Sequence, residues 1–335
     1  MYKRQALYPS GGVCVTGASY GAYHIATIRY DEAGSEVWVN RRARTYSSRP
    51  QAIAVDNEGN SYVSAGRIRD TYFDTLETVR YDSLGVEQWA IEHYWDGREV
   101  HGAVASIMDT SGYLYVAGIG DGSGIPPHRD FLTAKYDSEG TEVWLSRFDG
   151  GVGGHDVPRA MALAPDGCIY VAGYSRQSSG DYDLVLVKYD ADGGELWSVT
   201  HPGMDSPDGG AYGLAVDDSS HAYVAGATSD GTAGDWVILK YDSEGAVVWS
   251  DVFSGADGLD DRPCGLELDP YGGVYVAGYE GTAASGADYL SIKYDPDGTR
   301  LWTSSYNGDG DDTAHALAVD VLGRLYVTGM SEGDG

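Results

Sequence analysis

The hydrophobic and polar residues of the chain alternate in short segments that return about every 50 residues. Segments such as "AIAVD" (52–56), "YVAG" (170–173) and "LVLVKYD" (184–190) are rich in β-branched and aromatic residues, and Gly, Asp and Asn bound them. This pattern is typical of short β-strands joined by turns, and no stretch has the 3.6-residue period of a helix. It predicts an all-β chain.

Four such segments make up one repeat. The third and fourth belong to one phrase, seen as "VKYDADGGELW" (187–197), that occurs six times with a tryptophan eight residues after its tyrosine. A glycine that ends the second segment occurs seven times. The tyrosines are Tyr30, Tyr81, Tyr136, Tyr189, Tyr241 and Tyr294, and the tryptophans are Trp38, Trp89, Trp144, Trp197, Trp249 and Trp302.

Four strands in about 50 residues, repeated along a chain, are the sequence signature of a β-propeller. We therefore predict one domain, residues 1–335, of four-stranded antiparallel blades. Six blades are complete, at approximately 5–45, 51–94, 103–149, 159–203, 211–254 and 264–307, and residues 314–330 form a half blade. Seven positions are favoured over six, because in a six-bladed ring the last hairpin would compete with the first. The abrupt first and last segments also suggest an excerpt of a longer protein.

The phrases "ALAVD…YVTG" and "GDYDLVLVKYDADGGELW" resemble the SBBP-type (seven-bladed β-propeller) repeats. They are more distantly similar to NHL-like and PQQ-type propeller repeats. The resemblance covers nearly the whole chain and implies a secreted or cell-surface microbial protein, usually without an assigned activity. Its motifs are specific for the fold and say little about chemistry.

Composition excludes several classes of partner. The formal net charge is −29, with 51 acidic and 22 basic residues, which argues against nucleic acid and anionic membrane surfaces. The three cysteines, Cys14, Cys168 and Cys264, are scattered and predict no disulfide framework. No apolar run is long enough for a spanning helix, and the first residues show no signal peptide.

Loop lengths distinguish the two ends of the predicted blades. The links from the first to the second strand and from the third to the fourth are tight turns, which should leave little room for a site. The links from the second to the third strand, and from one blade to the next, are longer and vary more, as in "IGDGSGIPPHR". We expect any functional site at the end with these long loops.

One set of candidate residues precedes the second-strand tyrosine by 14 positions. It contains His101, Asp156, Asp261 and Asp312, which should lie near the mouth of a central channel and could bind a cation or a polar ligand. The competing interpretation, which we favour, is that they accept hydrogen bonds from loop amides. A second set, Asp130, Asp183, Asp235 and Asp288, precedes the third-strand tyrosine by six positions and is expected to cap loops. The basic residue directly before that tyrosine recurs in all six copies, which favours a structural role.

Calcium is the one cofactor that the motifs suggest. Asn307, Asp309 and Asp311 stand at alternate positions, as calcium ligands do, but Asp312 and Ala318 replace the glycine and the glutamate of an EF-hand. An irregular loop site therefore stays open. "GASYG" (17–21) matches a serine hydrolase pattern, yet Ser19 is expected in a strand-to-strand loop, where that nucleophile is not found.

The aspartate and glycine of "YDADGG" recur in every copy, whereas the second acidic residue does not, so the phrase predicts a type I turn and no metal loop. The sequence favours a non-catalytic, monomeric binding or scaffold module for a protein, peptide or saccharide ligand. The alternative is a lactonase-like or quinoprotein-like propeller enzyme with a divalent cation near the channel mouth.

Overall fold

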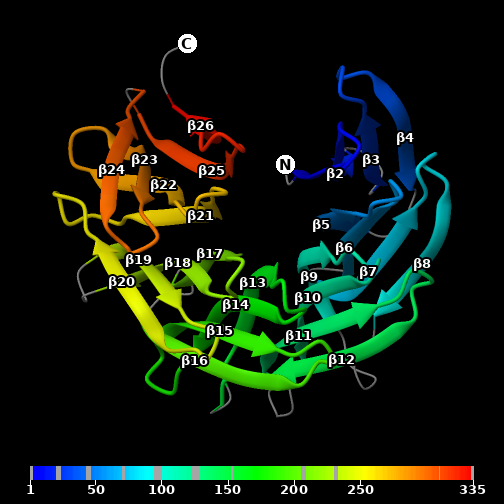
Figure 1. Ribbon diagram of the computed structural model, residues 1–335, viewed down its shortest axis with the longest axis horizontal. Coiled ribbons are helices and arrows are strands. Elements are labelled where there is room, and N and C mark those ends of the chain that lie inside the picture. Colours follow the sequence, from blue (N-terminus) through cyan, green and yellow to red (C-terminus); the bar gives the residue numbers. More distant parts are fainter. Residues whose placement is uncertain are drawn as a thin grey trace. The chain divides into compact units, whose positions relative to one another are not determined.

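The computed structural model describes residues 3–19, 24–42, 47–69, 72–93, 100–121, 128–151, 154–204, 209–229, 233–308 and 310–332. These residues form 26 β-strands joined by turns and loops, and they contain no helix (Figure 1). Among them we find no helix with the length and apolarity needed to cross a membrane. The predicted all-β class is thereby confirmed.

The chain divides into two compact units. Unit 1 comprises Met1–Asp149, His155–Pro158 and Asp192–Gly194, and unit 2 comprises Gly150–Gly154, Arg159–Ala191 and Glu195–Gly335. The three four-stranded sheets of unit 1 contain β1 (Lys3–Leu7), β2 (Val13–Ser19), β3 (His24–Tyr30) and β4 (Glu36–Arg42); β5 (Ser47–Val55), β6 (Ser61–Arg69), β7 (Tyr72–Tyr81) and β8 (Glu87–His93); and β9 (Val100–Met108), β10 (Leu114–Asp121), β11 (Arg129–Tyr136) and β12 (Glu142–Phe148).

Three further four-stranded sheets and one hairpin follow along the chain. They contain β13 (Asp156–Leu163), whose first residues count with unit 1, β14 (Ile169–Arg176), β15 (Tyr182–Tyr189) and β16 (Glu195–Met204); β17 (Gly210–Val216), β18 (Ala222–Ser229), β19 (Gly234–Tyr241) and β20 (Val247–Phe253); β21 (Arg262–Leu268), β22 (Val274–Thr282), β23 (Gly286–Tyr294) and β24 (Arg300–Tyr306); and the pair β25 (Asp312–Val319) and β26 (Leu325–Ser331).

Strand order follows chain order in every sheet, and the recorded strand pairs are antiparallel. Antiparallel order places the first-to-second and third-to-fourth turns of a sheet at one end, which we call the tight-turn end. The remaining loops lie at the other end, which we call the loop end. Six four-stranded sheets followed by a hairpin agree with the predicted multi-blade β-propeller. The fourth strands continue past the recurring tryptophan, and alternate exposure continues with them, as in β20.

The recurring "YD-x-x-G" phrase is a tight turn. In the copy at residues 241–246, Asp242 Oδ1 accepts hydrogen bonds from the amides of Glu244 and Ala246 at 3.0 and 2.8 Å. Gly245 donates its amide to the Asp242 carbonyl and has a φ of 85°, a conformation that glycine adopts without steric cost. The prediction that this motif is a turn is therefore confirmed.

The core of five of the six four-stranded sheets is built around the tyrosine of the second strand, and the first sheet has the buried Cys14 at that position. In unit 2, the Tyr223 ring is 1% exposed and contacts Trp249 from the fourth strand at 6.2 Å and Lys240 Nζ from the third strand at 4.9 Å. The same pairing of tyrosine, tryptophan and basic residue recurs in four other sheets. These aromatic contacts stabilise one sheet internally.

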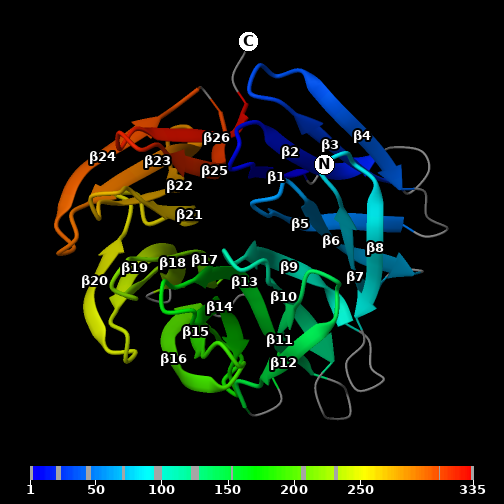
Figure 2. The same cartoon turned by 45° about the vertical axis from the view of Figure 1, so that its right-hand side comes forward.

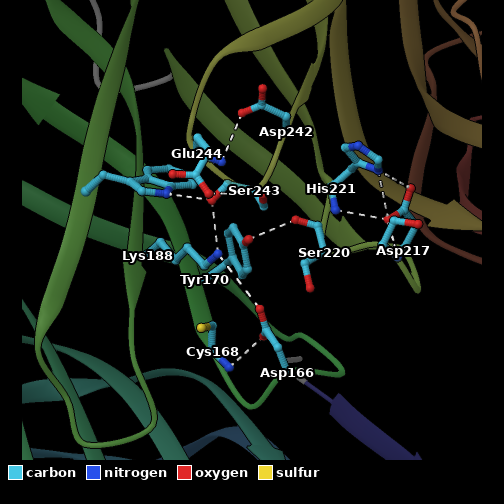
Figure 3. Close-up of polar contacts among 12 residues, drawn as sticks. Asp166, Cys168, Tyr170, Lys188, Asp217, Ser220, His221, Asp242, Ser243 and Glu244 are labelled. Carbon is cyan, nitrogen blue, oxygen red and sulfur yellow. Dashed lines mark hydrogen bonds and ion pairs between the residues drawn. The ribbon is translucent and has the colours of Figure 1, made fainter.

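Neighbouring sheets are joined at the tight-turn end by a shared acceptor (Figure 3). Lys188 Nζ and Trp197 Nε1 both donate to the carbonyl of Ser243, each at 3.0 Å, and Ser243 lies in the tight turn of the next sheet. Lys240 and Trp249 donate in the same way to the carbonyl of Pro296, both at 3.1 Å. The basic residues of the repeat therefore have the structural role that the sequence favoured.

Candidate functional site

Three carboxylates from one sheet and the start of the next strand come together at the loop end of unit 1. Asp130 is the second residue of β11, Asp149 follows β12 directly, and Asp156 is the first residue of β13. One oxygen from each lies within 4.8 Å of the others. Two oxygens that bind one Ca²⁺ at 2.3–2.6 Å can be at most roughly 5 Å apart, so this spacing permits a shared ion.

Burial and charge differ among the three side chains. Asp130 and Asp156 are each 1% exposed, whereas Asp149 is open to solvent. Arg147 is the cation beside them: its Nε contacts Asp130 Oδ2, and its Nη2 contacts Asp149 Oδ2 at 3.1 Å. This guanidinium thus bridges two of the three carboxylates.

Burial disfavours the ionised form of Asp130. Burial raises the pKa of its carboxyl group, and the nearby Asp149 adds to the rise, although Arg147 opposes it. Its Oδ1 is buried and has no hydrogen-bond partner among the described residues, which leave out 122–127. A buried acceptor without a partner is costly unless a cation or a proton reaches it. The cluster therefore combines a suitable geometry with an unsatisfied oxygen.

Two later junctions in unit 2, at the starts of β21 and β25, repeat the arrangement with different residues. At the sites of Asp130 and Asp156, these junctions carry Asp235 with Asp261, and Asp288 with Asp312. Ser254 and Asn307 stand where the first junction has Asp149. The third carboxylate is thus particular to the unit 1 cluster among these three junctions.

Each of the four residues predicted at the channel mouth can now be located. Asp156 belongs to the carboxylate cluster. Asp261 is fully buried and accepts hydrogen bonds from the amides of Gly255 and Gly281, at 2.5 and 2.8 Å, which is the loop-capping role. Asp312, also fully buried, accepts from the amide of Gly308. His101 lies in β9, but its side chain is outside the described residues. Ligand binding by these residues stays a prediction.

The predicted calcium loop has other bonds in the structure. Asn307 Nδ2 donates to Asp288 Oδ2 at 3.5 Å, and Asp311 Oδ1 accepts from the amide of Ala287 at 3.0 Å. Asp309 lies outside the described residues. Among the described residues, one group of at least three His, Cys, Asp or Glu side chains lies close enough together to share a metal ion. It is the Asp130 cluster.

Sequence reasoning missed Asp149 and assigned Asp130 to loop capping. Asp149 has no carboxylate counterpart in the two following repeats, so a comparison of columns does not select it. The one available signal was its position directly after a fourth strand, next to Arg147. Neither residue indicates a cluster until the topology brings β11, β12 and β13 together.

The tight-turn end was expected to leave little room for a site, and in unit 1 that expectation is wrong. A cleft of about 400 Å³ lies between the sheets β5–β8 and β9–β12. Asp56, Glu58, Asp109 and Glu139 line it, together with Arg80. The space lies between the turns of two sheets, whereas the expectation considered the turns one at a time.

Comparisons with known proteins place the chain among β-propellers. Residues 164–193 match a family described as a domain of unknown function, DUF5122, β-propeller. The match covers β14 and β15 and the turns on either side. No curated protein matches the chain. The narrower resemblance to SBBP repeats stays a prediction.

Solved structures similar to this chain have diverse names. A hydrazine synthase from Kuenenia stuttgartiensis is 13% identical, with a TM-score of 0.57 over 88% of this chain and 76% of its own. The polysaccharide lyase Uly1 is 12% identical, with a TM-score of 0.57 over 98% and 87%. A protein of unknown function from Dyadobacter fermentans DSM 18053 is 11% identical, with a TM-score of 0.51 over 91% and 93%. Identities this low show a shared fold only.

Proposed function

We propose that this chain is a non-catalytic binding module that recognises its ligand at the loop end, and that Asp130, Asp149 and Asp156 hold a divalent cation there. The observation that carries this proposal is a cluster of three carboxylates in which the buried Oδ1 of Asp130 has no hydrogen-bond partner within the part of the chain that the structure describes. All-oxygen ligands favour calcium or magnesium over softer metals. Calcium fits better, because it accepts irregular geometry.

A binding role agrees better with these side chains than a catalytic one. The nearest candidate for a general base, His155, accepts the Arg129 amide at its Nδ1 at 3.3 Å. Asp130 and Asp149 are already bridged by Arg147. Charge-assisted contacts of this kind fix loops in position, which is what a recognition surface needs. The enzyme names among the structural neighbours belong to those proteins.

The partner would be a protein, a peptide or a saccharide. A net charge of −29 favours a ligand that is cationic, or one that contacts the protein through the bound ion. We place this activity at the cell surface or outside the cell. Calcium sites of extracellular modules have dissociation constants of about 10⁻⁴–10⁻³ M, within reach of an open three-carboxylate cluster.

The first prediction concerns the ion. After treatment with a chelator, 5 mM CaCl₂ should stabilise the protein by about 1–2 kcal/mol, because an ion that binds only the folded state shifts unfolding by mass action. Thermal melting should show this as a rise of a few degrees. Asp149→Asn should abolish most of the rise with little effect on the fold, since this side chain is exposed.

Glu139→Gln is the matched control. Glu139 is exposed in the β11–β12 turn, at the tight-turn end of the same sheet, so this variant removes one negative charge far from the cluster. Its response to calcium should equal that of the wild type. Equal responses of all three proteins would mean general screening of an acidic surface, and no response in any of them would rule out the ion.

A further inference from the structure

The cleft at the tight-turn end of unit 1 has the size of a small-molecule site. The sheets β5–β8 and β9–β12 lie side by side in both views (Figures 1 and 2), and β9 contacts β5, β6 and β7. The turn at 56–60 forms one wall of the cleft, and the turns at 109–113 and 137–141 form the other. Its volume of about 400 Å³ lies within the range of ligand pockets, roughly 300–1,000 Å³.

Arg80, the next-to-last residue of β7, is the basic residue that lines this cleft. Its guanidinium lies 5.8 Å from the centre of the Tyr62 ring. Among the described residues Arg80 has no ion pair, and its Nε is buried without an acceptor. A buried donor that belongs to a charged group is costly to leave unpaired. An anionic group of a ligand would supply the acceptor.

A basic residue at the same position of another sheet does have an acceptor. Lys188 Nζ donates to the carbonyl of Ser243, in the turn of the next sheet, at 3.0 Å (Figure 3). The equivalent carbonyl at the cleft is that of Ser138, which accepts a hydrogen bond from Trp89 Nε1 at 2.9 Å. Within the described part of the chain, Arg80 makes no bond to it. The guanidinium is therefore free to bind a ligand.

Four carboxylates also line the cleft, and they are of two kinds. Asp56 and Asp109 close their own turns, because Oδ1 of each accepts two turn amides and Oδ2 accepts a tyrosine hydroxyl. Glu58 and Glu139 are exposed. Glu58 Oε2 accepts a long bond from Asn60 Nδ2, 3.5 Å, and the Glu139 carboxylate has no bond among the described residues. These two glutamates can accept hydrogen bonds from ammonium groups.

We propose that this cleft binds a basic α-amino acid of the size of lysine. Arg80 holds the carboxylate of the ligand, and Glu58 and Glu139 hold its ammonium groups. The carboxylates of the lining outnumber the one guanidinium, which favours a ligand with a net positive charge over a neutral amino acid. The site lies at the opposite end of the sheet from Asp130, so it does not depend on the proposed cation.

The probe is L-lysine, and the measurement is titration calorimetry at fixed ionic strength. The 335-residue chain should show saturable 1:1 binding, with a dissociation constant of about 1 mM or lower, which a ligand of this size can reach. Two analogues each lack one charged group of lysine. Diaminopentane lacks the carboxylate and L-norleucine lacks the side-chain ammonium group, and each should bind at least tenfold more weakly than L-lysine.

The variant Arg80→Gln tests the contact with the carboxylate. It should weaken the binding of L-lysine at least tenfold. Binding of diaminopentane should stay the same or become tighter, because the variant removes a like charge from the cleft. Retained binding of diaminopentane also shows that the cleft is still folded.

Glu139→Gln and Glu244→Gln form a matched pair. Glu244 is exposed at the same turn position of the sheet β17–β20, where Lys188 already has its acceptor. Glu139→Gln should weaken the binding of L-lysine at least threefold, and Glu244→Gln should bind it like the wild type.

Three results would overturn the proposal. The first is no saturable binding of L-lysine up to about 10 mM, well above the expected dissociation constant. The second is equal binding of diaminopentane and L-lysine, which would mean that an acidic surface attracts any cation. The third is an affinity for L-lysine that is the same in the wild type, in Arg80→Gln and in Glu139→Gln.

Discussion

At the scale of single residues, aspartate has two opposite electrostatic environments in this protein. Burial tends to raise the pKa of the turn residue Asp217, but hydrogen bonds from His221 and Ser219 leave it below the usual range. Burial of Asp261 raises its pKa to about 6, with contributions from Glu280 and Asp235, and two glycine amides only partly oppose the rise. The first carboxylate stabilises the fold as an anion, and the second is more stable protonated.

The raised pKa of Asp261 predicts that the free energy of unfolding depends on pH. Because the pKa of the folded state lies above that of the unfolded chain, the folded state holds more protons between about pH 4 and 6. Its contribution to the free energy of unfolding is greatest below about pH 4 and decreases by roughly 3 kcal/mol as the pH rises through 6. Asp261→Asn should remove this decrease, and urea unfolding at pH 4.5 and 7.5 measures it.

Asp218→Asn is the control for that experiment. Asp218 is exposed in the neighbouring tight turn, so the variant removes the same charge without a buried carboxylate. We expect its difference in unfolding free energy between pH 4.5 and 7.5 to match that of the wild type. If Asp261→Asn also matches the wild type, the pKa of Asp261 is not raised.

Single residues also show what the sequence could predict. Asp242 and Gly245 form the predicted turn, because the turn depends only on residues within six positions of each other. The loop-capping role of Asp261 depends on amides 6 and 20 residues away, and a recurring column was enough to predict it as an alternative. The Asp130 cluster needs three segments and has one member without a repeat, so no local pattern contains it.

At the scale of elements, the tight turn of one sheet packs on the tryptophan of the sheet before it. A Cβ atom added to Gly298 would lie 2.5 Å from the Trp249 ring, and one added to Gly245 would lie 3.1 Å from Trp197. The equivalent Gly34 in the first sheet has nothing within 4 Å. The glycine of this turn therefore has a conformational role in all three sheets and a packing role in two.

Gly298→Ala and Gly34→Ala should separate these two roles. Both glycines have positive φ, 86° and 78°, so each alanine has the backbone strain of about 1 kcal/mol. The free energy of unfolding should fall by about 1–3 kcal/mol more in Gly298→Ala than in Gly34→Ala, because the added methyl group collides with an indole ring. Chemical denaturation of both variants gives the difference directly, and equal losses would show that the indole moves aside without cost.

The presence of each strand was easier to predict than the residue at which it ends. The four segments of each repeat exist where the alternation placed them, because a strand with one buried face needs a period of two. The fourth strands run on for several residues after the tryptophan, since pairing with the third strand continues there, as Trp236 with Phe253. Backbone pairing of this kind leaves little trace in side-chain composition.

At the scale of the whole molecule, acidic residues outnumber basic residues by 51 to 22. With a net charge of −29 the folded chain repels itself, and salt screens that repulsion. Salt also screens ion pairs, such as Arg300 with Asp251 at 2.5 Å.

We therefore expect the melting temperature to rise between 20 and 500 mM KCl, with no divalent ion present. Differential scanning calorimetry at fixed pH is the measurement. Sodium sulfate at the same ionic strength is the comparison. A larger rise in sulfate than in KCl would measure the effect of excluding the salt from the protein surface. A fall in melting temperature would mean that ion pairs such as Arg147 with Asp130 outweigh the repulsion.

The fold as a whole was predictable because one four-stranded unit repeats along the chain. Six sheets and one hairpin agree with six complete repeats and one half repeat. The proposed site was not, because it includes Asp149, a residue that the other repeats do not share.

The bonds between sheets give the molecule a direction. In four bonds from a side chain to a carbonyl in a tight turn, Arg29 to Ser83, Trp89 to Ser138, Lys188 to Ser243 and Lys240 to Pro296, the donor belongs to the earlier sheet and the acceptor to the later one. A sheet therefore offers a turn carbonyl to the sheet before it, and an ammonium and an indole to the sheet after it. Deleting the first sheet and deleting the last sheet would therefore leave different groups without a partner. By this polarity, repeats should be gained and lost in evolution more easily at the first end than at the last.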